Sequence, residues 1–541
     1  MGESVKIGTV IWVEGVKVKF RIKDGVKIDR GQLAKVQHGG CRFILRVVDF
    51  RPESLLTQAE VARLSLRGEN GEEINIYDKP LRFYDTAIAV TVAQVEDGFK
   101  AHGPTSVPPL FSSVYTIGDE DLKMLDLDSG DIELGYVRQG HRVTGQHVRI
   151  NGLKTFPHHM LICSRTGGGK TNFSKVLALN ILSQSQGKYS LIIIDTEGEY
   201  FDGGDSIHLG LAHSPYSENR LLYITSSIDQ LCRRKYLLTV NGEVVERNIL
   251  TCPLRIPWSQ LHPEDFIQTG FLTPPQEALL WLLWRRRHED WLYTLIRADS
   301  NTIYEELNRQ VQKVTINTTK RKIRGMIGDE QIFIPDEKFD MLKHFMGAVK
   351  EGYVILIDLP SASELQEKLL TVTIARRVFS AYEGLKKVMP DEWLKLPTIL
   401  IVVEEAHRYL SKTVLREGGE NIFSTISKRG RKYRIGLCCI TQMPGELDEP
   451  IIRQQLTKII LPLPTKPDYS KVIQYSPYLD GASSEIKTLD EGEAILVSPP
   501  SGIKFAVPVK IHSFEELILE QIRGEASKPK LLVKEDGLLS T

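Results

Sequence analysis

The sequence predicts an α/β protein that has a small β-barrel at its N-terminus and a mostly helical insertion in its layered part. Three observations support this fold class. Residues 5 to about 100 alternate between apolar and polar positions, the runs after residue 150 are almost continuously apolar, and the strand pattern fades between about 215 and 350. Alternation with period two is typical of half-buried strands, and continuous β-branched runs are typical of parallel strands covered on both faces.

The first 150 residues are expected to form the barrel and a linker. The apolar residues from Val16 to Ile22 alternate with Lys and Arg, which predicts a half-buried strand. Short strands separated by Gly, Asp and Asn turn signals favour a small barrel, and three more are expected at Arg42–Val48, Glu73–Tyr77 and Thr86–Val95. The stretch Gly103–Ser113 is interpreted as a linker to an acidic segment.

The layered core is expected to occupy two stretches, residues 151–214 and 351–512. Its five strands are predicted at Met160–Cys163, Ser190–Ile194, Tyr353–Ile357, Thr398–Val403 and Ile435–Ile440. Helical stretches lie between these runs, and this order is typical of a layered α/β domain. Residues 215–350 are interpreted as the helical insertion, and residues 513–541 as a C-terminal helix and tail.

Composition excludes several classes of protein. The chain has 541 residues, 41% hydrophobic and 26% charged, which is globular composition. The 69 Lys and Arg residues balance the 69 Asp and Glu residues, so any contact with nucleic acid must come from local basic patches. The 6 cysteines show no CxxC spacing, which argues against structural zinc and a disulfide framework. Because neither a membrane-spanning run nor a signal peptide is found, we expect a cytoplasmic protein without a membrane contact.

A glycine-rich segment, Ser164–Thr171, lies between the first predicted core strand and a helix. Backbone N–H groups that wrap phosphate oxygens need glycines where a Cβ atom would clash, and the helix N-terminus favours the anion. Lys170 would reach the β- and γ-phosphates, and the Thr171 hydroxyl would ligate Mg²⁺. The alternative is an ordinary glycine-rich turn. The residues predicted to bind nucleotide here are Thr166, Gly167, Gly168, Gly169, Lys170, Thr171 and Asn172.

Polar side chains follow the four other predicted core strands. Glu404 and Glu405 follow Thr398–Val403, and we assign Glu404 to Mg²⁺ and Glu405 to the attacking water. The alternative is an acidic start of the next helix, which suits the helix dipole. Asp195 or Glu197 could reach a water near the γ-phosphate.

Gln442 follows Ile435–Ile440 and is either a γ-phosphate sensor or a satisfied loop amide. Asp358 is interpreted as a loop or cap acid, and His158, His159 and His407 are interpreted as structural because they lack metal-ligand spacing.

A run from Ser424 to Arg434 contains five basic residues and no acid. Such a run is usually a solvated face. Here one arginine could complete the nucleotide site of a neighbouring subunit, and Arg431 is our first choice and Arg429 our second. Lys412 and Arg416 are candidate DNA contacts, although they could equally be ordinary surface charges.

Taken together, these motifs resemble those of the HerA helicase/translocase family, within the HerA/FtsK group of P-loop motors. The matching segments are His159–Thr171, Asp195–Tyr200, Val403–His407, Lys428–Gly436 and Thr441–Pro444. Three residues depart from the family pattern: Ser164 replaces a glycine, Glu197 a histidine and Met443 an arginine. None of these departures removes a catalytic group.

The resemblance implies a RecA-like P-loop ATPase core with a HAS barrel. It also implies a homohexameric ring that hydrolyses ATP with Mg²⁺ at subunit interfaces and pumps double-stranded DNA through its pore. A NurA-type nuclease is the implied partner, in processing DNA ends for recombinational repair. Two alternatives stay open: a motor of the secretion or AAA type that moves polypeptide, and an ATPase scaffold that is not a motor.

Overall fold

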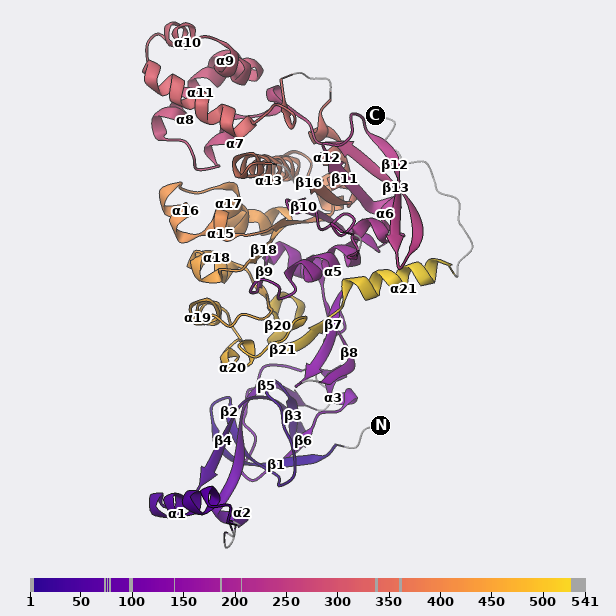
Figure 1. The fold of residues 1–541 in the computed structure, drawn as a ribbon, viewed down its shortest axis with the longest axis vertical. Coiled ribbons are helices and arrows are strands. Elements are labelled where there is room, and N and C mark those ends of the chain that lie inside the picture. The colour runs from indigo at the N-terminus through magenta and orange to yellow at the C-terminus, as the bar shows by residue number, and fades with distance from the viewer. Residues whose placement is uncertain are drawn as a thin grey trace. The chain divides into compact units, whose positions relative to one another are not determined.

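The computed structural model describes residues 4–526 except residues 73, 75, 77, 78, 97–100, 141, 185, 186, 206, 336–338, 360 and 361. The chain divides into two compact units, which we call the barrel unit and the ATPase-like unit. The barrel unit comprises the chain up to Ile150 together with Ile460–Ile511, and the other unit comprises Asn151–Ile459 together with the chain after Ile511. Figure 1 shows the elements of both.

Six antiparallel strands of the barrel unit form a closed barrel. In order around the barrel they are β1 (Lys6–Glu14), β2 (Lys17–Ile22), β5 (Phe83–Glu96), β4 (Cys41–Ser54), β3 (Leu33–His38) and β6 (Ser113–Thr116). Their alternate apolar residues, such as Val10, Phe20 and Leu45, are fully buried inside. The predicted small barrel is therefore confirmed. The stretch interpreted as a linker, Gly103–Ser113, leads instead into β6, and the strand expected at Glu73–Tyr77 falls partly outside the described residues.

Four more strands of the barrel unit come from both ends of the sequence and pair antiparallel with one another. In order they are β20 (Glu493–Ser498), β21 (Ile503–Ile511), β7 (Ile132–Gln139) and β8 (Arg142–Ile150). The helices of this unit are α1 (Gln58–Glu69), α2 (Lys79–Arg82), α3 (Asp119–Met124), α19 (Lys466–Gln474) and α20 (Ser483–Ile486). Residues 460–511 thus pack with the barrel, although the sequence suggests a place in the layered core. Strand patterning says how a strand is buried, but not which distant strand it pairs with.

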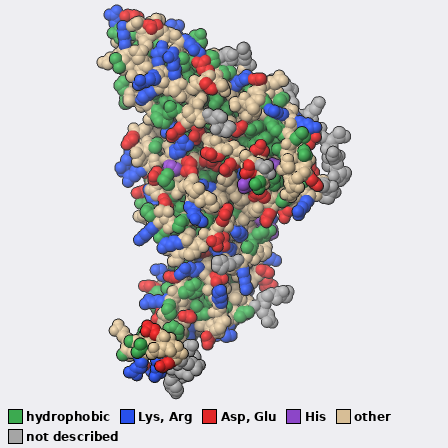
Figure 2. All heavy atoms as spheres, in the orientation of Figure 1, with side chains coloured by type: hydrophobic (Ala, Val, Ile, Leu, Met, Phe, Trp, Pro, Cys, Tyr) green, Lys and Arg blue, Asp and Glu red, His purple; other side chains and the backbone are tan. Residues whose placement is uncertain are grey.

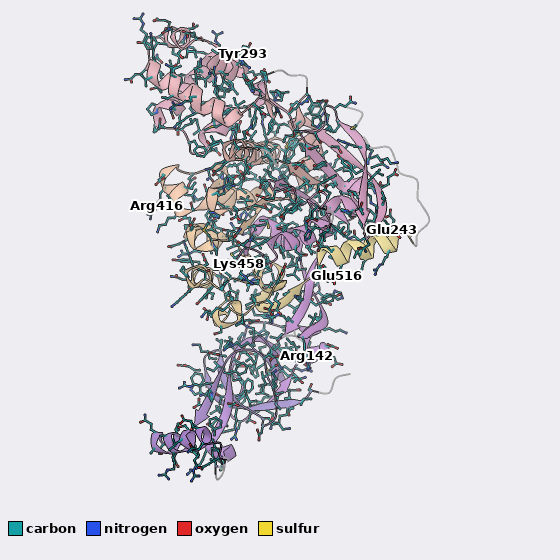
Figure 3. All side chains as sticks on the ribbon, in the orientation of Figure 1. Arg142, Glu243, Tyr293, Arg416, Lys458 and Glu516 are labelled. Carbon is teal, nitrogen blue, oxygen red and sulfur yellow. The ribbon has the colours of Figure 1, made fainter. Side chains whose placement is uncertain are left out.

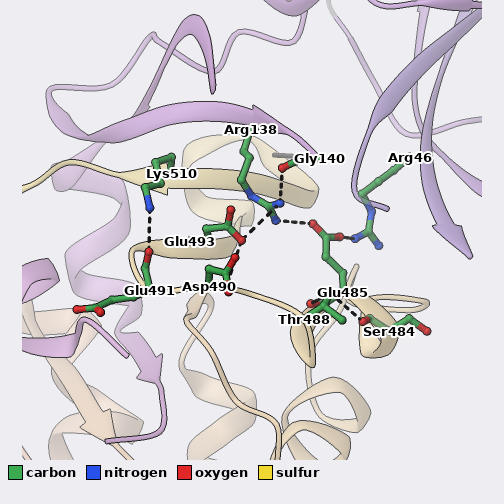
Figure 4. Close-up of polar contacts among 10 residues, drawn as sticks. All are labelled: Arg46, Arg138, Gly140, Ser484, Glu485, Thr488, Asp490, Glu491, Glu493 and Lys510. Carbon is green, nitrogen blue, oxygen red and sulfur yellow. Dashed lines mark hydrogen bonds and ion pairs between the residues drawn. The ribbon is translucent and has the colours of Figure 1, made fainter. Parts of the chain in front are cut away.

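A buried ion-pair network holds this C-terminal segment in the barrel unit (Figure 4). The carboxylate of Glu485, on α20, accepts hydrogen bonds from Arg46 at 2.8 Å and from Arg138 at 3.0 Å. Arg46 belongs to β4 and Arg138 to β7, and all three side chains are buried. Removing one partner of a buried ion pair typically costs about 3–5 kcal/mol. The network therefore fastens the barrel to residues that follow it by more than three hundred positions.

The ATPase-like unit is built on a sheet whose interior strands are parallel. The strands, in spatial order, are β12 (Cys232–Val240), β13 (Glu243–Pro253), β11 (Leu221–Thr225), β16 (Val354–Asp358), β10 (Tyr189–Asp195), β17 (Thr398–Val403), β18 (Ile435–Thr441), β9 (Met160–Cys163) and β19 (Thr457–Ile460). All five predicted core strands are present, and the carboxyl ends of the parallel strands share one edge. The two-residue strands β14 (Ile256–Pro257) and β15 (Phe333–Ile334) form a separate pair.

Helices complete the layered unit. The longer ones are α5 (Lys170–Leu182), α13 (Glu364–Val388), α17 (Ile422–Arg429) and α21 (Phe514–Ala526). The shorter ones are α4 (Gly152–Thr155), α6 (Ser217–Arg220), α14 (Pro390–Lys395), α15 (His407–Leu410), α16 (Lys412–Glu417) and α18 (Glu449–Gln454). The predicted C-terminal helix is confirmed as α21, and the tail beyond it lies outside the described residues.

The predicted helical insertion is present but begins later than expected. It consists of α7 (Pro263–Ile267), α8 (Pro274–Arg287), α9 (Trp291–Arg297), α10 (Ser300–Glu306), α11 (Lys313–Ile327) and α12 (Met341–Glu351). Residues 221–253, expected within the insertion, form strands β11, β12 and β13 instead. β12 lies at the edge of the sheet and exposes Arg234 and Lys235. Charged residues are common on edge strands, and in β12 they interrupt the apolar run by which a strand is predicted.

The distribution of charged and apolar side chains agrees with the balanced charge of the sequence. Basic and acidic side chains are interspersed over the face that Figure 2 displays. Within the described part of the chain, we find no helix that combines the length and the apolar character needed to cross a bilayer. The six cysteines are free thiols.

Candidate nucleotide-binding site

The glycine-rich loop joins the carboxyl end of β9 to the start of α5. Gly169 caps α5 with a φ of 96°, and Gly167 has a φ of 70°, both in the left-handed region that favours glycine. At Gly168 an added Cβ atom would lie 2.0 Å from Oγ of Ser164. The loop therefore keeps the open, glycine-only backbone that a phosphate cradle requires.

Ser164 is accommodated although the family has glycine there. It is buried, and its hydroxyl donates to the carbonyl of Arg165 at 2.9 Å, so its polar atom is satisfied. Lys170 donates to the same carbonyl at 3.2 Å. Burial lowers the pKa of Lys170, while Glu405 and Glu404 oppose that shift. The ammonium group of Lys170 thus lies beside the loop and near two carboxylates.

Three predicted site residues are joined by hydrogen bonds across the carboxyl edge of the sheet. Thr166 Oγ1 donates to Gln442 Oε1 at 2.5 Å, and Gln442 Nε2 donates to Glu405 Oε1 at 2.9 Å. Glu405 has a φ of 44°, an unusual conformation for a residue with a side chain. Strained backbone of this kind costs about 1–3 kcal/mol and is concentrated at functional sites. Gln442 therefore links the tip of the phosphate loop to the second acid.

Glu404 is the buried acid of the pair, and its carboxylate accepts a hydrogen bond from the hydroxyl of Tyr200. Burial raises the pKa of Glu404 to about 7; the hydrogen bond from Tyr200 opposes this, and the nearby carboxylates add to it. A cation would relieve this accumulation of negative charge. Tyr200 ends the Asp195–Tyr200 segment, and sequence reasoning did not select it because a buried aromatic is usually a core residue.

The other two carboxylates predicted near the γ-phosphate behave differently. Asp195 is buried and accepts hydrogen bonds from the backbone N–H groups of Glu197, Gly198, Glu199 and Tyr200. Its carboxylate shapes the turn that carries Tyr200 to Glu404. The side chain of Glu197 is exposed. The nucleotide contacts of Asp195 and Glu197 stay predictions.

His407 joins the site although the sequence suggested only a structural role. Its Nδ1 lies 3.3 Å from Glu405 Oε2 and 3.2 Å from Thr441 Oγ1. The sequence feature that could have indicated this role is the position of His407 two residues after Glu405. This position places the ring at the start of α15, beside the acid. Asp358, interpreted as a loop or cap acid, is the last residue of β16 and accepts hydrogen bonds from the side-chain hydroxyls of Tyr223 and Thr225 on β11.

The side chain of Asn172 is bonded to the chain around the start of α21. Its Nδ2 donates to the carbonyl of His512 at 2.8 Å, and its Oδ1 accepts from the N–H of Phe514 at 2.9 Å. Both polar groups of the side-chain amide are therefore engaged by the chain itself. The nucleotide contact of Asn172 stays a prediction.

The two candidate arginines lie at the opposite edge of the sheet. Arg429 ends α17 and donates to Glu383 at 2.9 Å, and Arg431 is exposed in the turn that follows. Both precede β18, whereas Thr441 and Gln442 follow at its carboxyl end. A seven-residue strand spans about 20 Å. Neither arginine is therefore placed to serve the site of its own chain.

The candidate DNA contacts lie on the short helix α16. The side chains of Lys412 and Arg416 are exposed, and Figure 3 labels Arg416 at this helix. α16 begins after Ser411, whose hydroxyl accepts from the N–H of Val414. Exposure leaves both cations accessible to a partner.

The donor set fits a magnesium–nucleotide complex better than a free metal ion. Among the described residues, no group of three or more His, Cys, Asp or Glu side chains could hold a metal by itself. Mg²⁺ is usually bound through one or two carboxylates and substrate phosphates. The Thr171 hydroxyl and the Glu404 carboxylate, the two predicted ligands, would supply such a partial set.

The comparison with known families gives a domain match. Residues 132–378 match the family described as "Helicase HerA, central domain". This part of the chain is similar to that domain. This confirms the resemblance and the P-loop fold class. Glu404, Glu405 and Gln442 lie beyond the matched residues, at the carboxyl ends of the paired strands β17 and β18.

Relatives that align over most of the chain agree with the HerA match. The chain is 26% identical over 475 residues to the DNA double-strand break repair helicase HerA of Saccharolobus solfataricus, covering 83% of each protein. It is 24% identical over 537 residues to the probable helicase MJECL08 of Methanocaldococcus jannaschii, covering 95% of this chain and 97% of that one. Among solved structures, the plasmid coupling protein TrwB is 11% identical with a TM-score of 0.45, over 74% of this chain and 93% of that chain.

Proposed function

We propose that this chain is an ATP hydrolase that translocates double-stranded DNA. The observation that carries the proposal is the hydrogen-bonded set Thr166–Gln442–Glu405, which lies beside the phosphate loop and next to the buried Glu404. A phosphate cradle, an acid for the metal, an acid for the water and an amide sensor are the parts that phosphoryl transfer requires.

Each side chain has a defined task in this mechanism. Lys170 and the N–H groups at the start of α5 bind the phosphates, and Thr171 and Glu404 would hold Mg²⁺, which would neutralise phosphate charge. Glu405 orients the attacking water and accepts its proton. His407 and Gln442 fix the Glu405 carboxylate from two sides. Because Gln442 also contacts Thr166, its amide can report the arrival of a γ-phosphate to Glu405.

The proposed assembly is a homohexameric ring. Arg431 and Arg429 lie at the sheet edge opposite the phosphate loop, where a neighbouring subunit could receive them. A trans arginine can raise hydrolysis by a factor of about 10³ or more. We assign Arg431 as the first candidate because Arg429 is already bonded to Glu383.

Double-stranded DNA is the proposed cargo because curated relatives are named DNA double-strand break repair helicases. A zero net charge is compatible with a ring that places basic loops in its channel. A NurA-type nuclease partner, a role in end resection and recombinational repair, and a cytoplasmic location complete the proposal.

The deciding experiment measures steady-state ATP hydrolysis by the full chain with Mg²⁺, alone and with duplex DNA. We expect basal hydrolysis that duplex DNA stimulates. Stimulation by unfolded polypeptide but not by DNA would replace the proposal with a polypeptide motor. ATP binding without any hydrolysis would replace it with a scaffold.

A further inference from the structure

The first turn of α5 is bonded to the chain around the start of α21. Asn172 uses both polar ends of its side-chain amide for this purpose, donating to His512 and accepting from Phe514. A side-chain amide that donates to one main-chain carbonyl and accepts from one main-chain N–H bonds to the chain as a neighbouring β-strand would. This arrangement restrains the helix far more closely than one hydrogen bond would.

A second residue of α5 reinforces the same contact one turn along. Lys175 is buried, donates to the carbonyl of Leu209 at 3.1 Å, and lies 5.5 Å from the centre of the Phe514 ring. The Phe514 side chain itself is fully buried. The beginning of α21 is therefore packed into the ATPase-like unit rather than resting on its surface.

The rest of α21 is held at two further points. The hydroxyl of Ser214 donates to Gln521 at 2.8 Å, and the guanidinium of Arg247, on β13, is paired with Glu525 at 2.7 Å. Glu516 is exposed to solvent on the same helix, where Figure 3 labels it. α21 is thus an anchored element, and Asn172 connects the phosphate loop to it.

The position of the first turn of α5 matters because of what that turn must do. The first N–H groups of a helix have no partner within the helix, and here they face the place where phosphates bind. Thr171, the candidate Mg²⁺ ligand, is the residue immediately before Asn172. A misplacement of about 1 Å at a catalytic centre can cost a factor of about 100 in rate.

We propose that Asn172 is a positioning residue for hydrolysis. It holds the first turn of α5 against the start of α21, and so fixes the Thr171 hydroxyl and the phosphate-binding N–H groups. The inference rests on the proposed ATP hydrolysis. It also makes α21 part of the nucleotide site, at the junction where the chain passes from the barrel unit to the ATPase-like unit. Linkage requires that a nucleotide strengthens the docking of α21 by the same factor by which that docking favours the nucleotide.

The experiment compares the full-length wild type with three variants. Asn172→Ala removes both hydrogen bonds, and Asn172→Asp keeps the acceptor for Phe514 while removing the donor to His512. Asn180→Ala is the matched control, because Asn180 lies on the same helix and donates to Val176 within that helix. For each protein we would measure kcat and KM for ATP, the melting temperature, and hydrogen exchange of residues 512–518 with and without ATP and Mg²⁺.

We expect kcat to fall about tenfold in Asn172→Ala and KM to rise by the factor by which ATP protects residues 512–518 in the wild type. We expect an intermediate kcat in Asn172→Asp and no change in the control. ATP should protect residues 512–518 in the wild type and not in Asn172→Ala. Wild-type kcat in Asn172→Ala, an equal loss in the control, or ATP-dependent protection that survives Asn172→Ala would overturn the inference. If the wild type binds ATP without hydrolysing it, the proposed function is contradicted but the inference is not. The comparison of hydrogen exchange between wild type and Asn172→Ala then still tests the role of Asn172.

Discussion

The Nε2 atom of Gln442 lies 2.9 Å from Oε1 of Glu405 and donates a hydrogen bond to it. The two residues come from different strand ends, β18 and β17, which are neighbours in the sheet. The same glutamine accepts from Thr166, in the phosphate loop. Parallel pairing of β17, β18 and β9 therefore places the water-activating acid, the amide and the loop along one edge.

The first prediction separates nucleotide binding from hydrolysis. Lys170→Ala should abolish turnover and weaken ATP binding, because we propose that the lysine binds the phosphates. Glu405→Gln should keep ATP binding and stop hydrolysis, since only the activation of water is removed. Both are checked by a filter-binding assay beside a phosphate-release assay. A folded Glu405→Gln protein with wild-type turnover would exclude Glu405 from this role.

The second prediction concerns the amide that holds Glu405. Gln442→Ala removes the bond to Glu405 and the bond to Thr166, so the acid loses its orientation while the phosphate loop stays intact. We expect kcat to fall by about 100-fold, which is the lower end of what general acid–base catalysis contributes, and ATP affinity to be retained. Met443→Ala is the control, because Met443 is the next residue and its side chain is 42% exposed. Equal kinetics in both variants would contradict the sensor role.

The third prediction concerns the neighbouring subunit. Arg431→Ala should bind ATP almost normally and hydrolyse it slowly. Mixing Arg431→Ala with Glu405→Gln subunits should restore part of the activity, because some interfaces then contain both intact groups. The measurement is ATP hydrolysis across mixing ratios, with sedimentation to establish the assembly. A fully active monomer leaves no place for a trans arginine.

The fourth prediction concerns the binding of DNA. Replacing both Lys412 and Arg416 with Ala should weaken duplex binding uniformly across sequences and leave basal ATP hydrolysis intact. For every DNA phosphate that the double variant no longer neutralises, the slope of log K against log salt concentration should become shallower by about 0.9. Fluorescence anisotropy at several salt concentrations measures this slope. An unchanged slope in the double variant would show that the DNA-binding cations lie elsewhere.

The fifth prediction is a pH dependence of stability that arises at His159. Its Nδ1 accepts a hydrogen bond from the N–H of Leu437 at 3.0 Å, so the folded protein requires the neutral ring. Burial lowers the pKa of His159 to about 4. The unfolded chain therefore takes up a proton that the folded chain does not between about pH 6.5 and 4, and stability falls as pH falls through that window, by up to about 3 kcal/mol.

The variant that tests it is His159→Asn, which keeps an acceptor near the same place and does not titrate. Urea unfolding at pH 7 and at pH 4.5 should show a smaller loss of stability for this variant than for the wild type. The carboxylates that also titrate in this range are common to both proteins and cancel in the comparison. Equal losses would mean that His159 does not control the effect.

Much of this protein is determined by its sequence alone. The loop with Gly167, Gly168 and Gly169 predicts a phosphate cradle from the sequence alone, because such a cradle is formed by the local backbone conformation and not by distant residues. Five strands of the core are predicted to within about a residue, since continuous apolar runs indicate burial on both faces, whereas β11, β12 and β13 are not predicted. The placement of Glu404 and Glu405 at a strand end was predicted for the same reason.

Tertiary structure alone decided the contacts between distant segments. Tyr200 donates to Glu404 across 204 positions, and Asn172 bonds to Phe514 across 342. Residues 460–511 complete the barrel unit through Glu485, which pairs with Arg46 and Arg138. Hydropathy periodicity records how deeply a residue is buried, but a hydrogen bond or an ion pair needs a particular partner, and which partner arrives depends on the pairing of whole strands and helices.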